Sequence, residues 1–215
     1  MKVPYNYLPQ EFENVTEIMN GWEKLIKSSE YTLGPFVENW EKKFAKFVNA
    51  KYCISTNTGT DALILALKAL NLNSTDEVIT VANTFYATVG AIIAVGAKPV
   101  LIDVDDRFQM NVDRIEEAIT PHTKVIMPVH WGGSFPEMKA ICEIAKKNKL
   151  TIIEDACMGI GGSINQKHPG TFGEIGAFSM HPLKSLNAIG DGGMLVTDNE
   201  QLFNWMSKYR NHGMV

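Results

Sequence analysis

Hydrophobic positions along most of this chain follow two alternating patterns. Short runs of β-branched and aliphatic residues recur, and between them lie longer stretches with apolar residues three or four positions apart. The short runs predict strands at 52–56, 77–81, 99–103, 124–129 and 150–154, and the longer stretches predict helices at 61–70, 86–95, 112–119 and 137–147. Strands that alternate with helices of this length indicate βαβ units and a largely parallel sheet.

The two ends of the chain add further elements to this pattern. Helices are predicted at 13–28 and 36–48, separated by the turn sequence Thr32-Leu33-Gly34-Pro35. Two short strands at 177–180 and 194–197 follow a loop-rich stretch, and a helix at 200–210 comes after them. The whole pattern predicts an α/β protein.

Composition and charge narrow the classes of function. Hydrophobic residues make up 45% of the 215 residues and charged residues 20%, which is typical of a folded domain with a full core. The net charge is −4 and no block of Lys or Arg stands out, so the charge pattern does not favour a nucleic-acid partner. The first residues lack a signal-peptide pattern and no apolar run approaches membrane-spanning length, so we expect a cytoplasmic location without membrane association.

The three cysteines, Cys53, Cys142 and Cys157, lack the spacing of a zinc site, and we predict no metal centre. We expect small, buried, reduced thiols, although Cys157 follows a candidate site residue.

Ligands of open α/β sheets bind beyond the carboxyl ends of the strands, so the residues that follow each predicted strand are the candidates for chemistry. After the first strand comes Thr56-Asn57-Thr58-Gly59-Thr60-Asp61-Ala62-Leu63. Small residues at the start of a helix, with free amides and a favourable dipole, can bind a phosphate through the amides near Gly59 and the Thr60 hydroxyl. The alternative is that Thr58 or Thr60 only caps the helix.

Two other strand ends carry candidate residues. Ile152-Ile153-Glu154-Asp155 ends an apolar strand with two acids, and a buried Asp155 would need a partner such as a cationic nitrogen. The alternative is an Asp that caps the next turn. Phe85, in Asn83-Thr84-Phe85-Tyr86, can stack on a planar cofactor or belong to the core.

A single lysine lies between the two last predicted strands. Phe178-Ser179-Met180-His181-Pro182-Leu183-Lys184-Ser185-Leu186-Asn187 leads into Gly190-Asp191-Gly192-Gly193. An unpaired lysine near apolar walls has its charged form disfavoured, and the neutral amine is then available as a nucleophile for Schiff-base chemistry. A solvated surface lysine is the alternative, and it fits poorly with so few charged neighbours.

Taken together and in this order, these motifs resemble the DegT/DnrJ/EryC1/StrS family of sugar-nucleotide aminotransferases. The resemblance runs over nearly the whole chain. It is carried by Thr60-Asp61-Ala62-Leu63, Asp76-Glu77-Val78-Ile79, Pro128-Val129-His130, Ile153-Glu154-Asp155-Ala156, His181-Pro182-Leu183-Lys184-Ser185-Leu186-Asn187, Gly190-Asp191-Gly192-Gly193 and Arg210-Asn211-His212-Gly213. It implies the large domain of a type I pyridoxal-phosphate (PLP) enzyme, a three-layer α/β/α fold with a mostly parallel central sheet. It also implies an N-terminal segment 1–35, a PLP-binding large domain 36–215, and a C-terminal small domain beyond this chain.

The resemblance also implies roles for individual residues. Lys184 matches the lysine that binds the cofactor as a Schiff base and moves a proton between substrate and cofactor. Asp155 matches the acid that pairs with the protonated pyridine nitrogen and keeps the ring an electron sink. The cofactor-binding set implied is Gly59, Thr60, Asp61, Phe85, Asp155, Met158, Ser179 and Lys184. In this set Gly59, Thr60 and Ser179 match contacts to the phosphate, and Phe85 matches the aromatic ring that stacks on the cofactor.

The sequence departs from the family pattern near the cofactor ring. Met158 stands where the family commonly has Gln or His, and Ile160 replaces a frequent His. A thioether is only a weak hydrogen-bond acceptor, so the tuning of the cofactor and the substrate class stay open. His130, Trp131 and His181 are possible pocket residues, and each is equally compatible with a structural role.

The activity that the resemblance implies is transamination. An amino acid, usually glutamate in the family, donates the amino group, and a keto-sugar or sugar nucleotide receives it, in a homodimer whose active sites include residues of both subunits. Three alternatives remain: a PLP-dependent sugar dehydratase, in which histidine replaces the lysine; a cysteine desulfurase of the same fold; and a non-catalytic regulatory protein. Lys184, together with Gly190-Asp191-Gly192-Gly193, favours the sugar aminotransferase.

Overall fold

The computed structural model describes residues 3–214, in which seven strands form one sheet. The strands are β1 (Tyr52–Thr56), β2 (Glu77–Val81), β3 (Lys98–Ile102), β4 (Thr123–Ile126), β5 (Thr151–Asp155), β6 (Ile175–Ser179) and β7 (Gly193–Thr197). The helices are α1 (Leu8–Glu11), α2 (Thr16–Ser28), α3 (Pro35–Val48), α4 (Gly59–Ala69), α5 (Tyr86–Ala94), α6 (Ile115–Ala118), α7 (Met138–Asn148) and α8 (Glu200–Arg210), with 3-10 turns η1 (Val112–Arg114) and η2 (Trp131–Gly133).

The strand order is β1-β7-β6-β5-β4-β2-β3. Neighbouring strands are parallel from β6 to β3, whereas β7 is antiparallel to both β6 and β1. Because β7 runs opposite to both of its neighbours, β1 runs in the same direction as β6. The carboxyl ends of β1, β2, β4, β5 and β6 therefore meet at one edge of the sheet. The predicted α/β fold with a mostly parallel sheet is confirmed.

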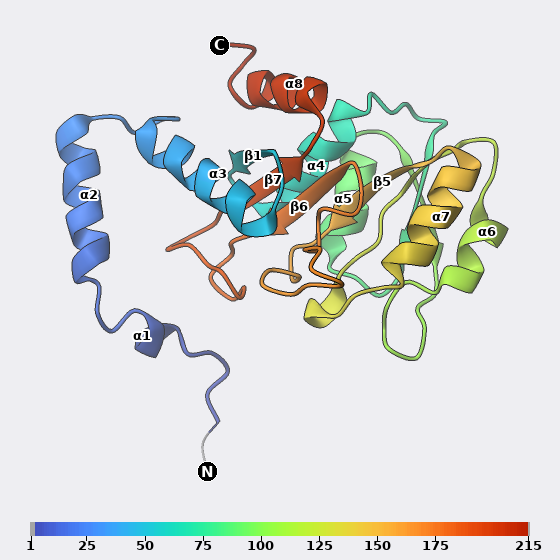
Figure 1. The fold of residues 1–215 in the computed structure, drawn as a ribbon, viewed down its shortest axis with the longest axis horizontal. Helices are drawn as coiled ribbons and strands as arrows, with labels where there is room; N and C mark the ends of the chain where they lie inside the picture. Colours follow the sequence, from blue (N-terminus) through green and yellow to red (C-terminus); the bar gives the residue numbers. More distant parts are fainter. Residues whose placement is uncertain (1–2, 215) are drawn as a thin grey trace.

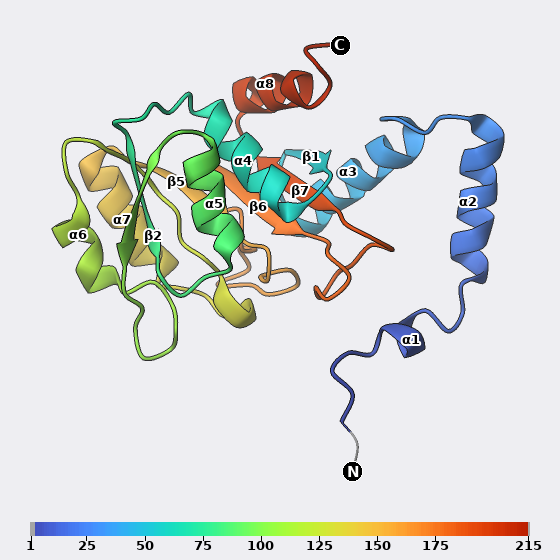
Figure 2. The ribbon, with the colours of Figure 1, turned by 180° about the vertical axis from the view of Figure 1, so that it is seen from behind.

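Helices cover both faces of this sheet, because successive side chains of each strand point to opposite faces. In β5, Ile153 packs with α4, α5 and α8, whereas the preceding Ile152 packs with α6 and α7. The second face continues onto α3, where Phe44 packs against Phe178 of β6 with ring centroids 5.1 Å apart. Figure 1 looks onto the face that α3, α6 and α7 cover, and Figure 2 looks onto α4 and α5 from behind. The structure thus has the three layers that were predicted.

The N-terminal elements lie apart from these layers. α1 and α2 extend away from the sheet (Figure 1), and α2 buries none of its residues even though its apolar side chains gather on one side. The chain joins the layered body at Pro35, the first residue of α3. The division into segments 1–35 and 36–215 stays a prediction. Within residues 3–214, no helix combines the length and apolar character that a bilayer crossing requires.

Two predicted elements are shorter than the sequence pattern indicated. The strand predicted at 124–129 ends at Ile126 in β4, since Pro128 has no amide hydrogen to donate to a neighbouring strand. The helix predicted at 112–119 is divided between η1 and α6, where the side chain of Asn111 accepts a hydrogen bond from the amide of Asp113 and tightens the first turn. The short α1 was not predicted.

Gly193 allows one close approach on which this architecture depends. It begins β7, and a Cβ at this position would overlap the carbonyl oxygen of Thr58. We expect Gly193→Ala to lower the free energy of unfolding by about 1–3 kcal/mol through forced displacement of the turn before α4, measured by urea denaturation. Gly90→Ala is the control, because its Cβ meets no atom within 4 Å and should stabilise α5 by up to about 1 kcal/mol. Equal unfolding midpoints for Gly193→Ala and the native protein would contradict the close approach.

Candidate functional site

A cavity of about 540 Å³ lies at the carboxyl edge of the sheet. Seven of the eight predicted cofactor-binding residues line it: Gly59, Thr60, Phe85, Asp155, Met158, Ser179 and Lys184. They come from segments that follow β1, β2, β5 and β6, so the parallel direction of these strands brings them together. Trp131 and His181 also line this cavity, as the sequence allowed.

The N-terminus of α4 forms one end of the cavity. Thr58 caps the helix, and its Oγ1 accepts a hydrogen bond from the amide of Asp61 at 2.9 Å. Within residues 3–214 the amides of Gly59 and Thr60 have no backbone or side-chain acceptor, which leaves them free for a ligand. The sequence allowed this motif to be a helix cap or an anion site. Thr58 is the cap, and the amides of Gly59 and Thr60 remain available to bind an anion.

Gly59 lies directly against the end of β6. A Cβ on Gly59 would come within 2.6 Å of the Cβ of Ser179, so only glycine lets the helix start this close to the strand. The Ser179 hydroxyl oxygen accepts a hydrogen bond from the amide of His181 at 3.3 Å, and its own hydrogen stays available. Two amides and the hydroxyls of Thr60 and Ser179 thus converge at a helix N-terminus, which is an arrangement suited to a phosphate.

Asp155 ends β5 at the floor of the cavity and is only 5% exposed. Its Oδ2 accepts a hydrogen bond from Thr88 Oγ1 at 2.6 Å, and its Oδ1 accepts one from the amide of Cys157 at 3.2 Å. The pKa of the Cys157 thiol lies well above its ordinary value because burial disfavours the thiolate and the charge of Asp155 adds to this effect. Cys157 is therefore a protonated thiol, and Asp155 is the acid of this wall.

Lys184 enters the cavity from the loop between β6 and β7. The loop is tightened by hydrogen bonds from the amide of Lys184 to the carbonyl of His181 at 2.8 Å and from Asn187 Nδ2 to the carbonyl of Pro182 at 3.0 Å. The Lys184 side chain is half-buried, and no acid between residues 3 and 214 pairs with it. This placement agrees with the sequence argument for an unpaired lysine beside apolar walls.

Apolar side chains form the remaining walls. Phe85 is 54% exposed, so it is a cavity wall and not a core residue, and its ring lies 4.1 Å from that of Tyr86. Met158 and Trp131 are half-buried on the lining. An aromatic ring and a thioether suit the faces and edge of a planar ligand.

His130 does not reach this cavity. It is completely buried, and its Nε2 lies 2.8 Å from Oε2 of Glu154, the neighbour of Asp155 on β5. Because alternate residues of a strand face opposite sides, Glu154 points away from the cavity while Asp155 faces it. The Glu154 carboxylate also accepts amide hydrogen bonds of 2.6–2.8 Å from Gly170, Phe172 and Gly173. His130 is therefore part of a structural network that fixes loop 156–174.

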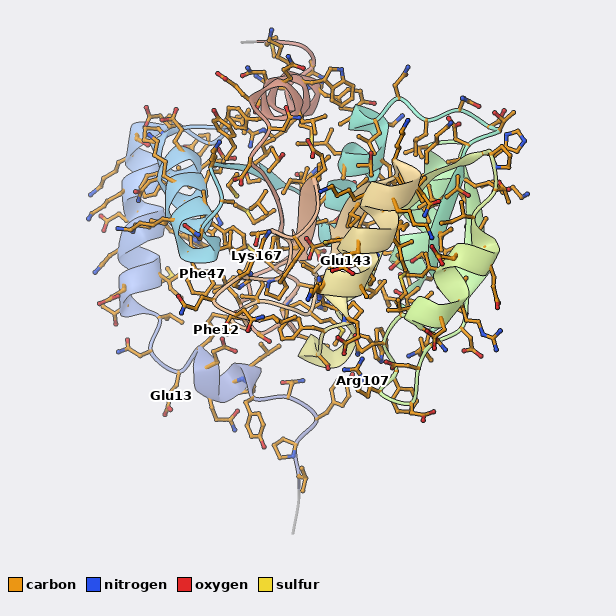
Figure 3. All side chains as sticks on the ribbon, turned by 45° about the vertical axis from the view of Figure 1, so that its right-hand side comes forward. Phe12, Glu13, Phe47, Arg107, Glu143 and Lys167 are labelled. Carbon is orange, nitrogen blue, oxygen red and sulfur yellow. The ribbon has the colours of Figure 1, made fainter. Side chains whose placement is uncertain are left out.

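A second buried histidine fixes the middle of the same loop. His168 Nδ1 donates to the carbonyl of Pro169 at 2.7 Å, and its Nε2 accepts from the amide of Gly161 at 3.0 Å. One nitrogen donates and the other accepts, so the ring is neutral. Figure 3 marks Phe47 of α3 and Lys167 of the loop; the Phe47 ring lies 5.6 Å from that of His168 in an edge-on arrangement.

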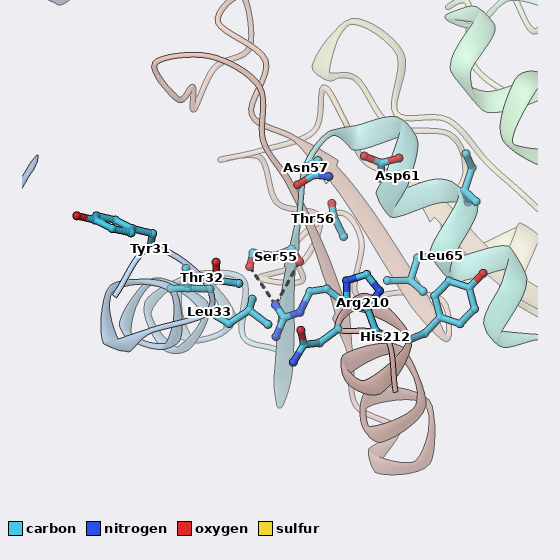
Figure 4. Close-up of a pocket in the computed structure, with 14 residues that line it drawn as sticks. Tyr31, Thr32, Leu33, Ser55, Thr56, Asn57, Asp61, Leu65, Arg210 and His212 are labelled. Carbon is cyan, nitrogen blue, oxygen red and sulfur yellow. Dashed lines mark hydrogen bonds between the residues drawn. The ribbon is translucent and has the colours of Figure 1, made fainter. Parts of the chain in front are cut away.

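A second cavity, of about 650 Å³, lies between segment 31–37, β1, α4 and the end of α8 (Figure 4). In it Arg210 is paired with Glu41 and donates to Ser55 Oγ at 3.0 Å, while the amide of Ser55 donates to Glu41 at 2.7 Å. Asp61, the eighth predicted cofactor-binding residue, lines this cavity and not the first one. Lys184 and Asp155 are absent from its lining, so the smaller cavity is the candidate site.

Several lining residues were not identified from the sequence. They are Thr58, Leu63, Thr84, Tyr86, Ala87, Val129, Cys157, Leu183 and Asp191, and Thr88 lies behind them, bonded to Asp155. A signal existed for two of them: Thr84 and Thr88 are four residues apart at a strand end, and Thr88 interrupts an otherwise apolar helix. Thr84 lies just before the N-cap Phe85 of α5 and Thr88 in its first turn, so both face the end of β5.

The sequence model of the DegT/DnrJ/EryC1/StrS aminotransferase family matches residues 13–215. A 3-oxo-glucose-6-phosphate:glutamate aminotransferase of Bacillus subtilis is 39% identical over 99% of this chain and 48% of its own length. A UDP-N-acetyl-3-dehydro-alpha-D-glucosamine 3-aminotransferase of Acidithiobacillus ferrooxidans is 44% identical over 92% of this chain and 54% of its own. A pleiotropic regulatory protein of Geobacillus stearothermophilus is 40% identical over 99% of this chain and 58% of its own.

Solved structures share the fold. DesV of S. venezuelae, in complex with a ketimine intermediate, superposes with a TM-score of 0.95 at 34% identity, over 99% of this chain and 58% of that one. An E. coli GDP-4-keto-6-deoxy-D-mannose-3-dehydratase with bound hydrated PLP superposes with a TM-score of 0.80 at 28% identity, over 85% of this chain and 48% of that one. The chain thus spans about half the length of the proteins it matches.

The buried Glu154 carboxylate gives a first prediction from this site. In Glu154→Gln one of the two acceptor oxygens becomes an amide nitrogen, so either orientation turns a donor towards two of the four donors that Glu154 receives. We expect a loss on the order of 3 kcal/mol in the free energy of unfolding, measured by urea denaturation. Glu137→Gln is the control, because its ion pair with Arg107 at 3.0 Å is exposed and should cost less than about 1 kcal/mol. Equal effects of the two substitutions would contradict the network.

His168 predicts a dependence of stability on pH. Burial lowers the pKa of His168 below its ordinary value, while the unfolded chain takes up the proton near pH 6.5. The stability that the neutral ring contributes is complete above about pH 6.5 and is lost as the pH falls towards the lowered pKa of the folded state. We expect the free energy of unfolding to fall between pH 7 and 5, and His168→Gln to flatten this slope. The exposed His122, changed to Gln, should leave the slope intact; a slope that His168→Gln retains in full would assign it to other groups.

Proposed function

The chain belongs to the DegT/DnrJ/EryC1/StrS aminotransferase family, and from this membership we propose that it is a PLP-dependent aminotransferase that transfers an amino group from an amino acid to a keto-sugar or sugar nucleotide. One observation carries the proposal. A single cavity brings together a lysine that no acid within residues 3–214 pairs with, a buried carboxylate and the N-terminus of α4. These are the three groups that would hold the amine-reactive, ring and phosphate parts of PLP.

The phosphate end fits the free donors of the site. The amides of Gly59 and Thr60 and the hydroxyls of Thr60 and Ser179 would bind the phosphate oxygens, with the dipole of α4 favouring the negative charge. The close approach of Gly59 to Ser179 supports this, because both donor groups would then reach the same phosphate.

The ring end fits the walls. Phe85 would stack on one face of the pyridine ring, and Met158 would lie against its edge. Asp155 would accept a hydrogen bond from the protonated ring nitrogen, which compensates its buried charge. Bound in this way, PLP supplies an electron sink for a carbanion at the substrate carbon.

Lys184 supplies the amine that would hold the cofactor covalently. It lies on the cavity wall, and no acid within residues 3–214 pairs with it, so the amine can reach a ligand in the cavity. The same amine would lie beside the substrate carbon, where it could take a proton from that carbon and return it to the cofactor side. Lys184 is thus the proposed general base and acid of both half-reactions.

The proposed substrates follow from the relatives' names. One relative is a glutamate aminotransferase of a 3-oxo-glucose 6-phosphate and another acts on a UDP-linked 3-dehydro-glucosamine, which supports glutamate as donor and a keto-sugar as acceptor. We further propose a cytoplasmic homodimer. Support comes from the exposed aromatic pair Phe85 and Tyr86 at the cavity wall, since Tyr86 is 77% exposed and a partner subunit would cover it.

Two alternatives come from the comparisons. A sugar dehydratase shares the fold, but the lysine at position 184 of this chain argues against that activity. A regulatory protein is 40% identical, which makes a non-catalytic binder the second candidate.

An absorbance spectrum with PLP, recorded before and after addition of glutamate, separates these functions. A band near the visible edge that bleaches with glutamate supports the aminotransferase. A band that persists with every amino acid supports the dehydratase or the non-catalytic binder, and the absence of a band refutes the assignment of Lys184.

Substitution of the lysine gives the corresponding prediction. Lys184→Ala should retain partial binding of PLP through the α4 end, lose the band near the visible edge and lose turnover by at least about 10⁴-fold. Binding is measured by equilibrium dialysis and turnover by formation of 2-oxoglutarate. Lys146→Ala, on the exposed surface of α7, is the matched control and should behave as the native protein does. Normal turnover of Lys184→Ala would overturn the assignment.

A further inference from the structure

Three side chains form a continuous hydrogen-bonded chain from the cavity wall to its acid. Thr84 lines the cavity, and its Oγ1 lies 2.7 Å from Oγ1 of Thr88. Thr88 Oγ1 in turn lies 2.6 Å from Oδ2 of Asp155. Thr88 lies in the first turn of α5, and Asp155 is the last residue of β5.

The direction of this chain is fixed by the number of hydrogens. A carboxylate has none to donate, so Thr88 uses its single hydroxyl hydrogen on Asp155. Thr88 can then only accept from Thr84, and the Thr84 hydroxyl points its hydrogen inward. The Thr84 oxygen offers the cavity only lone pairs.

Burial makes these contacts matter. Thr88 is fully buried and Asp155 is 5% exposed, so water does not replace a lost partner freely. Each carboxylate oxygen accepts one hydrogen bond from the protein, Oδ2 from Thr88 and Oδ1 from the amide of Cys157, and each keeps a lone pair. Bonds to both oxygens fix the plane of the carboxylate.

We propose that Thr88 is a positioning residue, oriented by Thr84, which holds the Asp155 carboxylate in the plane that the cofactor's ring nitrogen requires. The inference rests on the proposed function, because it concerns the acid of the same site. A carboxylate with one free oxygen can rotate about its Cβ–Cγ bond, and a well-directed bond to a planar ring then costs additional ordering.

Thr88→Val tests this role, because it replaces the hydroxyl by a methyl group of similar size. We expect the dissociation constant for PLP, from an absorbance titration, to rise roughly tenfold to hundredfold. Thr88→Ser, which restores the donor, should recover most of the affinity. Inorganic phosphate would compete with PLP only at the α4 end of the cavity. Its inhibition constant against PLP binding should therefore stay within about twofold of the native value.

Thr80→Val is the matched control for a purely structural effect. Thr80 is also fully buried, but its hydroxyl donates to the carbonyl of Met127 at 2.8 Å, away from the cavity. We expect both Thr80→Val and Thr88→Val to lower the unfolding midpoint, because each removes a buried hydrogen bond. Thr80→Val should leave the affinity for PLP unchanged. Thr84→Val should give a smaller loss of affinity than Thr88→Val, since the bond from Thr88 to Asp155 survives.

The outcomes distinguish this inference from its premise. If the native protein takes up PLP and Thr88→Val binds it equally well or more tightly, the positioning role is wrong and the proposed function stands. If Thr80→Val loses affinity to the same extent, the effect of Thr88 is structural and the inference fails. If the native protein takes up no PLP, both the function and the inference fall.

Discussion

The buried carboxylate of Glu154 is the interaction on which the site depends. Four donors converge on it, three of them backbone amides of one loop, and the side chain is fully buried. Because Glu154 and Asp155 are adjacent in a strand, fixing the first towards the loop fixes the second towards the cavity. The network therefore determines how Asp155 faces the cavity, although none of its members lines that cavity.

Much of the fold was predictable because it follows from periodicity. The strands β1, β2 and β5 to β7 and the helices α3 to α5, α7 and α8 lie within two residues of the predicted ranges. The predicted ranges were wrong where a single residue ends or tightens an element. Examples are the end of β4 before Pro128 and the 3-10 turn that Asn111 caps. The antiparallel insertion of β7 was also beyond a pattern that reports strands but not their partners.

The candidate site was predictable to a different degree. Residues that end strands, such as Asp155 and Ser179, could be recognised because the carboxyl edge of a sheet is where ligands bind. Asp61 shows what adjacency leaves undecided: the turn of α4 that brings Gly59 to the first cavity carries Asp61 round to the second one, and its role in cofactor binding stays a prediction. Thr88 and the role of His130 depend on contacts between segments far apart in the sequence, which no local motif records.

The placement of β7 beside β6 has a consequence for how this site can diversify. Because the two strands are antiparallel neighbours, the segment that carries Lys184 is a hairpin connection, whereas the segments after β2 and β5 belong to crossovers that must span the sheet. A hairpin connection can lengthen, shorten or change its side chains without altering the strand order or any helix. Lys184 thus lies on a connection that topology constrains little, whereas Phe85 and Met158 lie on crossover segments that topology constrains more.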